Sequence, residues 1–226
     1  MNLSVVLDFL SALEQNNNRD WFHANKPWYA EANRSFEQLV SQLQQALREI
    51  DGSLPLVEPK ELTFKLMRDT RFSQDKSPYN PAYRAHISSK GKLPIPVGYY
   101  LFLRPGDRSF LGGGLFADMF ADATRMVRDY ICAHGDAWQQ VISDPVFTAS
   151  FTVGGAALKN VPRGYDAGHP QAAYLKNKSW YLEYPVPDEQ LLAPDFVRFA
   201  VDVYKKMQPF NAYLNRALDG FEMPAR

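Results

Sequence analysis

Residues 98–111 read GYYLFLRPGDRSFL, and the fold class can be predicted from them. The runs 98–103 and 109–111 are rich in the aromatic and aliphatic residues typical of β-strands. Between them stands the sequence Pro105-Gly106-Asp107, which favours a tight turn. A connection this short cannot hold a crossover helix, so the two strands must pair antiparallel. The sequence therefore predicts a β-hairpin near the middle of the chain.

Alternation of apolar and polar residues predicts further strands on both sides of this hairpin. Leu62, Phe64 and Leu66 alternate with more polar neighbours, as in a half-buried strand. The other predicted strands span 83–89, 151–153 and 180–186.

Apolar residues spaced three and four apart predict helices in the rest of the chain. Asn18 suits the N-cap of a short helix over 19–24, and Pro27 suits the start of a long one. The predicted helices span 3–13, 19–24, 27–50, 119–134, 136–142, a helix that begins at Pro170, and 194–218 with Pro209 inside it.

These elements group into one domain over residues 1–226, because no repeat, low-complexity tract or linker divides them. We expect helices in 1–52, a sheet-rich region in 60–116, helices in 118–150, loop and strand in 151–187, and a C-terminal helix in 194–219. The predicted class is α+β, with a mostly antiparallel sheet packed by N-terminal, central and C-terminal helices.

Composition excludes several classes of protein. The chain has 226 residues, of which 46% are hydrophobic and 22% charged, so disorder, collagen and coiled coil are excluded for the whole chain. Cys132 is the single cysteine, which rules out an intrachain disulfide and favours a core thiol over a nucleophile. No apolar run approaches the roughly 20 residues of a membrane span, and no basic leader precedes the first helix. We expect a cytoplasmic protein without a membrane partner.

The net charge of zero is a sum of opposed regions. Residues 60–92 hold eight basic and three acidic side chains, and residues 156–180 hold four basic and one acidic. These surpluses of five and three are balanced by a deficit of eight elsewhere. A neutral total disfavours a general polyanion binder but allows a local basic site.

The first basic segment offers a candidate anion site. Arg68, Arg71 and Lys76 can capture a phosphate or carboxylate, Tyr79 can assist, and Asp69 is a candidate acid–base group. The alternative is a salt-bridged turn in which Asp69 and Asp75 satisfy Arg71 and Lys76.

The second basic segment adds three candidates. Pro162 and Gly164 restrict the backbone on both sides of Arg163, and Lys159 lies nearby. His169, before a proline, is a candidate catalytic acid or base, although a lone histidine is more often structural.

The histidines and the run of three glycines do not predict a metal or phosphate site. The four histidines lack metal-ligand spacing, so no metal and no cofactor is predicted. Gly112-Gly113-Gly114 lacks the Gly-Lys-Ser/Thr ending of a phosphate loop, which favours close backbone packing instead.

Several motifs together resemble those of a family of microbial proteins catalogued as domain of unknown function 2461. They are the opening residues Phe9-Leu10, 17–22 (NNRDWF) and Tyr29, and the segments 68–73 (RDTRFS), 75–79 (DKSPY), 98–100 (GYY), 111–114 (LGGG), 162–165 (PRGY) and 169–170 (HP). The resemblance spans most of the chain and implies a soluble single-domain protein. It supplies no substrate and no catalytic residue.

Three hypotheses follow for the function. The leading one is a pocket on which both basic segments converge to bind a small anionic ligand, either as an enzyme or as a binding protein. The second is single-stranded nucleic-acid binding, with Phe72, Tyr79 and Tyr83 stacking on bases. The third is a non-catalytic interaction module that meets an acidic partner or a second copy; no oligomeric state is predicted.

Overall fold

A four-stranded antiparallel sheet forms the centre of the fold, with its strands in the order β1-β2-β3-β4. The computed structural model describes residues 1–116 and 120–224. In the predicted hairpin, Leu101 pairs with Leu111 and Phe102 with Phe110. This confirms the antiparallel sheet and the α+β class. The strands are β1 (Tyr83–Ile87), β2 (Tyr99–Leu103), β3 (Ser109–Leu115) and β4 (Trp180–Val186).

Helices precede the sheet, follow it and separate β3 from β4. The N-cap prediction is confirmed, since the Asn18 side chain accepts a hydrogen bond of 2.9 Å from the backbone N–H of Trp21. The predicted start of the central helix, Met119, lies outside the described residues. The helices that the spacing predicted are α1 (Leu3–Gln15), α2 (Arg19–Ala24), α3 (Lys26–Arg48), α5 (Ala121–Ala133), α6 (Gly135–Ser143), α8 (Ala172–Leu175) and α10 (Phe196–Ala217).

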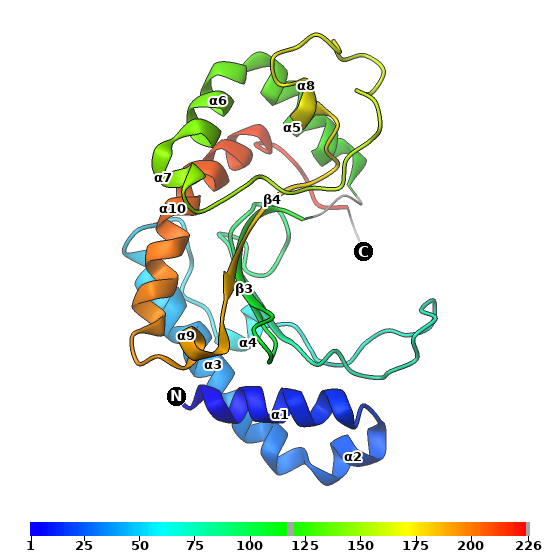
Figure 1. The fold of residues 1–226 in the computed structure, drawn as a ribbon, viewed down its shortest axis with the longest axis vertical. Coiled ribbons are helices and arrows are strands. Elements are labelled where there is room, and N and C mark those ends of the chain that lie inside the picture. The colour runs from blue at the N-terminus through cyan, green and yellow to red at the C-terminus, as the bar shows by residue number, and fades with distance from the viewer. Residues whose placement is uncertain (117–119, 225–226) are drawn as a thin grey trace.

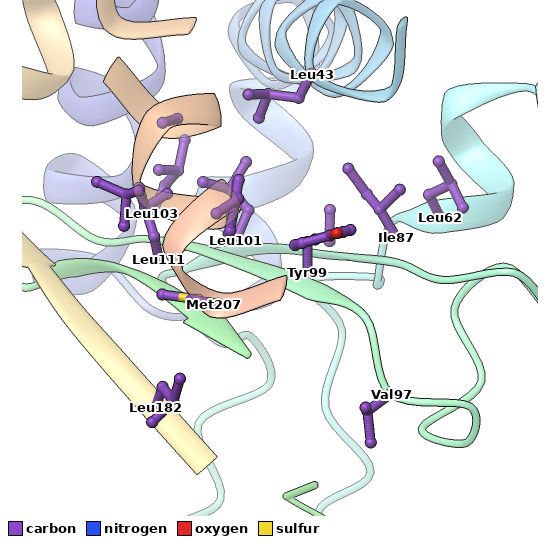
Figure 2. Close-up of a cluster of buried hydrophobic side chains, with 14 of the residues drawn as sticks. Leu43, Leu62, Ile87, Val97, Tyr99, Leu101, Leu103, Leu111, Leu182 and Met207 are labelled. Atoms are coloured by element: carbon purple, nitrogen blue, oxygen red, sulfur yellow. The ribbon is translucent and has the colours of Figure 1, made fainter. Parts of the chain in front are cut away.

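The sheet has one covered face and one open face. Helices α3 and α10 pack on the covered face, whereas no helix of the described residues lies on the other (Figure 1). Leu43 of α3 and Met207 of α10 meet Leu101 and Leu111 of the sheet in the core between them (Figure 2). Helices α1 and α2 lie at one end of the long axis, and α5 to α8 lie at the other.

Two predicted strands are wrong. Residues 62–67 form no strand, because Pro59 begins a short helix, α4 (Pro59–Leu62), and only Thr63 and Met67 make single bridges, to Ala85 and Tyr79. Residues 151–153 likewise have no ladder, and the only bridge nearby joins Gly154 to Tyr181. In both segments the apolar side chains are used for packing without a continuous partner strand.

Two further short helices, α7 (Pro145–Thr148) and α9 (Asp188–Leu192), were not predicted. Each has about one turn, which is too short for an apolar period to show in the sequence. In α7 the carboxylate of Asp144 caps the first turn by accepting from the backbone N–H groups of Val146 and Phe147.

Candidate functional site

The first basic segment forms a hairpin-like loop, residues 67–79, that extends away from the sheet beside the junction of α1 and α2 (Figure 1). The N–H of Arg68 donates to the carbonyl of Pro78 at 2.9 Å and closes the base of the loop. Asn17, at the end of α1, fixes this base to the helices. Its carboxamide donates to the carbonyl of Tyr79 at 2.9 Å and accepts from the N–H of Tyr79 at 3.1 Å.

A pocket of about 350 Å³ lies between this loop and the α1–α2 junction. Arg19, Arg68 and Lys76 line it, and no carboxylate of the described residues does. Amide and hydroxyl groups contribute to the wall, so the lining offers donors to an anion, while Asp75 pairs with Arg68 from outside the lining. The other lining residues are Asn17, Asn18, Met67, Thr70, Pro78 and Tyr79.

The three cations differ in how far they are already engaged. Arg68 pairs with Asp75 and also donates to the carbonyl of Ser77 at 3.2 Å. The Lys76 ammonium donates to the carbonyl of Thr70 at 3.0 Å, which leaves protons for a ligand. Arg19 has no hydrogen-bond or ion-pair partner among the described residues, so its guanidinium is available to a bound anion.

The salt-bridge alternative holds for Arg71 and fails for Lys76. Arg71 and Asp69 form an exposed bidentate pair, with guanidinium-to-carboxylate distances of 2.6 and 3.0 Å. Asp75 pairs with Arg68 instead of with Lys76. The hydrogen bonds from Arg71 hold the pKa of Asp69 below its usual value, so this carboxyl stays ionised and is a poor proton donor near neutral pH.

Tyr79 holds the pocket wall in place. Its side chain is buried, and its ring stacks on that of Phe22 with centroids 4.2 Å apart. Tyr83, on β1, is buried as well and stacks on Phe36 at 4.8 Å. Of the three rings predicted to stack on nucleic-acid bases, only Phe72 is exposed.

The second basic segment lies elsewhere, so the predicted convergence of the two segments is wrong. Residues 156–170 lie beside α5 and α8 near one end of the long axis, whereas the loop of residues 67–79 projects from the side of the molecule nearer to α1 and α2 (Figure 1). Lys159 and Arg163 are exposed there, with no ion-pair partner among the described residues. Both segments are rich in basic residues, and this shared composition predicted a common site. In the fold the two segments lie apart.

His169 lines a second cavity, of about 500 Å³, with His134 and Cys132. Its Nδ1 accepts from the N–H of Gln171 at 3.0 Å, so the ring is fixed by its own loop. Cys132 is half-buried instead of fully buried as predicted. Burial raises the pKa of its thiol, which therefore stays protonated at neutral pH.

Two residues of the first pocket, Asn17 and Arg19, were not predicted from the sequence as site residues. Asn17 lies between the predicted helices 3–13 and 19–24, and Arg19 is the first residue of the second of them. The partner of Asn17 is Tyr79, 62 positions away, and nothing in the spacing of the sequence joins these two segments.

Within residues 1–116 and 120–224, no three His, Cys, Asp or Glu side chains form a group that could hold a metal ion. In the same residues, no helix is both long and apolar enough to cross a membrane.

The fold and the pocket define a single-domain α+β protein with a cationic recess between a helical end and a projecting loop. A family profile described as conserved hypothetical protein (DUF2461) matches residues 5–213, and the chain belongs to this family. No curated protein and no solved structure matches the chain.

Proposed function

We propose that the protein binds a compact phosphate- or carboxylate-bearing metabolite in the pocket between the loop of residues 67–79 and the α1–α2 junction. The observation that carries this proposal is the lining: Arg19, Arg68 and Lys76 face one recess that no described carboxylate lines. Such a concentration of donors is stable only with water, ions or an anionic ligand to share the charge. A cytoplasmic location forms part of the proposal and rests on the absence of cysteine pairs.

Size and shape favour a small ligand over a nucleic acid. A recess of about 350 Å³ accommodates a metabolite, whereas a nucleic-acid strand needs cations spread along a face together with exposed rings. Tyr79 and Tyr83 are buried, and the second basic segment lies beside α5 and α8, apart from the loop of residues 67–79. These observations favour a small ligand over a nucleic acid.

Calorimetric titration with inorganic phosphate, pyrophosphate and citrate at low salt tests the proposal. We expect Arg19→Ala and Lys76→Ala each to weaken binding about tenfold, because each removes a charge-assisted hydrogen bond. Arg71→Ala and Arg163→Ala are matched controls, because both remove an exposed arginine that does not line the pocket. Binding of none of the anions, or equal loss in the Arg71→Ala control, would reject the proposal.

The same titration with a single-stranded oligonucleotide tests nucleic-acid binding against metabolite binding. Tight, salt-sensitive binding of the oligonucleotide that depends on Phe72 would favour it over the metabolite.

The interaction-module hypothesis has one observation of its own, the ring of Phe72. This ring is 95% exposed at the loop tip, with the Arg71 guanidinium 5.7 Å from its centroid. Sedimentation at low and high salt tests self-association through this tip, and a monomer in both conditions removes that form of the hypothesis.

A further inference from the structure

The open face of the sheet carries a layer of aromatic rings. Tyr100 on β2 and Phe110 on β3 point away from the core, with ring centroids 5.9 Å apart, and Phe102 stacks on Phe110 at 4.8 Å. Phe116, just after β3, stacks on Tyr181 of β4 at 4.6 Å. These rings are half-buried or exposed, although no helix among the described residues covers them.

A cavity of about 410 Å³ lies over these rings, and its lining is mostly apolar. Gly112 stands between Tyr100 and Glu183 in the row of paired residues across the sheet, and its missing side chain leaves room for neighbouring rings. A Cβ at Gly112 would lie 3.3 Å from the ring of Phe116, so this ring rests directly above the glycine. The floor of the cavity is therefore aromatic, with the Tyr100 ring tilted by 34° against Phe110 and by 40° against Phe116, and the cavity has room for a molecule of one or two rings.

Lys92, Glu183 and His86 line this cavity, and the Arg84 guanidinium on β1 lies 5.4 Å from the ring centroid of Phe64, another lining residue. His86, on β1, is buried, and burial lowers its pKa to about 4. Hydrogen bonds with the backbone of Leu93 and Lys92 act in the opposite direction but are outweighed by burial. The imidazole is therefore uncharged at neutral pH. Lys92 directs its ammonium to the carbonyl of Thr63 at 3.2 Å, beyond the β1 edge of the sheet.

Glu183 stands on the opposite side, on β4. It has no hydrogen-bond or ion-pair partner among the described residues, and partial burial raises the pKa of its carboxyl above the usual value. His86 and Glu183 are the two ends of one cross-strand row, separated by three strand spacings of about 4.8 Å each. The negative charge thus lies at the β4 side of the rings, well apart from Lys92.

We propose that this cavity binds a small aromatic amine, with its ring on Tyr100, Phe110 and Phe116 and its ammonium group at Glu183. The faces of aromatic rings carry partial negative charge and attract cations, and an unpaired carboxylate at their edge adds to that attraction. An anionic ligand is disfavoured, because it would face the carboxylate and the ring faces together. This site shares no lining residue with the pocket lined by Arg19, Arg68 and Lys76. Its proposed ligand also carries the opposite charge.

Three probes with one ring system and different charges test the proposal: tryptamine, indole and indole-3-acetate. We expect the wild-type chain to bind tryptamine about tenfold more tightly than indole, and indole-3-acetate more weakly than indole, in NMR titrations. Glu183→Gln is expected to reduce tryptamine affinity to that of indole and to leave indole binding unchanged. Glu49→Gln, an exposed glutamate at the end of α3 on the other side of the sheet, is the matched control.

Phe116→Ala tests the aromatic floor and is expected to weaken all three probes several-fold. Phe72→Ala removes another exposed ring, outside the cavity, and is expected to leave all three affinities unchanged. Failure of every probe to bind, equal binding of tryptamine and indole-3-acetate, or no effect of Glu183→Gln would overturn the proposal. Phosphate binding is expected to be the same in wild type and Glu183→Gln, so this result is independent of the anion pocket.

Discussion

At the scale of single residues, Gly114 shows why three consecutive glycines occupy β3. Its φ is +86°, a conformation that residues with a side chain rarely adopt. A Cβ there would lie 2.3 Å from the carbonyl oxygen of Trp180 and 2.8 Å from the ring of Phe210. At Gly113 a Cβ would lie 3.0 Å from the sulfur of Met207. The glycines allow α10 and β4 to approach β3 closely, which confirms the packing interpretation of this motif.

We expect Gly114→Ala to lower the free energy of unfolding by about 3 kcal/mol, because it adds left-handed strain of about 1–2 kcal/mol to an overpacked contact. Gly52→Ala is the control, since a Cβ at Gly52 meets no atom within 4 Å. Equilibrium unfolding in urea measures both variants. Equal midpoints for the two would show that the close approach at β3 is not required.

At the scale of elements, α10 holds the sheet through side-chain amides as well as through apolar packing. The carboxamide of Asn211 accepts from the N–H of Gly114 at 2.8 Å and donates to the carbonyl of Gly98 at 3.0 Å. One turn later, Asn215 makes the same pair of bonds with Val97, at 2.9 and 3.0 Å. The helix thereby satisfies backbone groups that the sheet leaves unpaired.

Asn211→Leu is expected to destabilise the fold by about 2–4 kcal/mol, because it leaves a buried N–H and a buried carbonyl without partners. Asn215→Leu is expected to cost less, about 1 kcal/mol, since Asn215 is half-buried and water can replace its bonds. Thermal unfolding followed by calorimetry measures the difference. A larger loss for Asn215→Leu would contradict the role assigned to burial.

Elements with a strong local signal could be predicted from the sequence, and those that depend on distant contacts could not. The Asn18 cap and the residues after it predict the observed bounds of α2. The mostly apolar run 180–186 predicts those of β4. Residues 62–67 alternate like a strand, yet no neighbouring segment supplies a continuous ladder.

Some residues of the candidate site could likewise be predicted from the sequence, and others could not. Arg68 and Lys76 share one loop, so the sequence could place them together. Arg19 joins them only because Asn17 binds the backbone of Tyr79 across 62 positions. Arg163 shares their charge but not their place in the fold.

At the scale of the whole molecule, charge pairs connect the helical end to the sheet. Glu14, near the end of α1, pairs with Arg104 and accepts from Arg108 at 3.0 and 2.6 Å, and both arginines flank the turn between β2 and β3. The hydrogen bonds from Arg108 and then Arg104 lower the pKa of Glu14 to about 2. A carboxyl whose pKa is lowered by folding stabilises the protein above its unfolded pKa of about 4.5, and this contribution is lost as the pH falls toward 2.

We therefore expect Glu14→Gln to reduce stability at pH 7 by about 1 kcal/mol, a modest value because the side chains are partly exposed and water screens the pairs. The difference between variant and wild type is expected to shrink as the pH falls from about 4.5 toward 2, because protonation removes the same charge from the wild type. Urea unfolding at a series of pH values measures this, with Glu49→Gln as the control for removing an exposed carboxylate. A constant difference between Glu14→Gln and wild type across that range would mean that Glu14 stabilises the fold by packing instead of by its charge, and would leave the helical end joined to the sheet by apolar contacts alone.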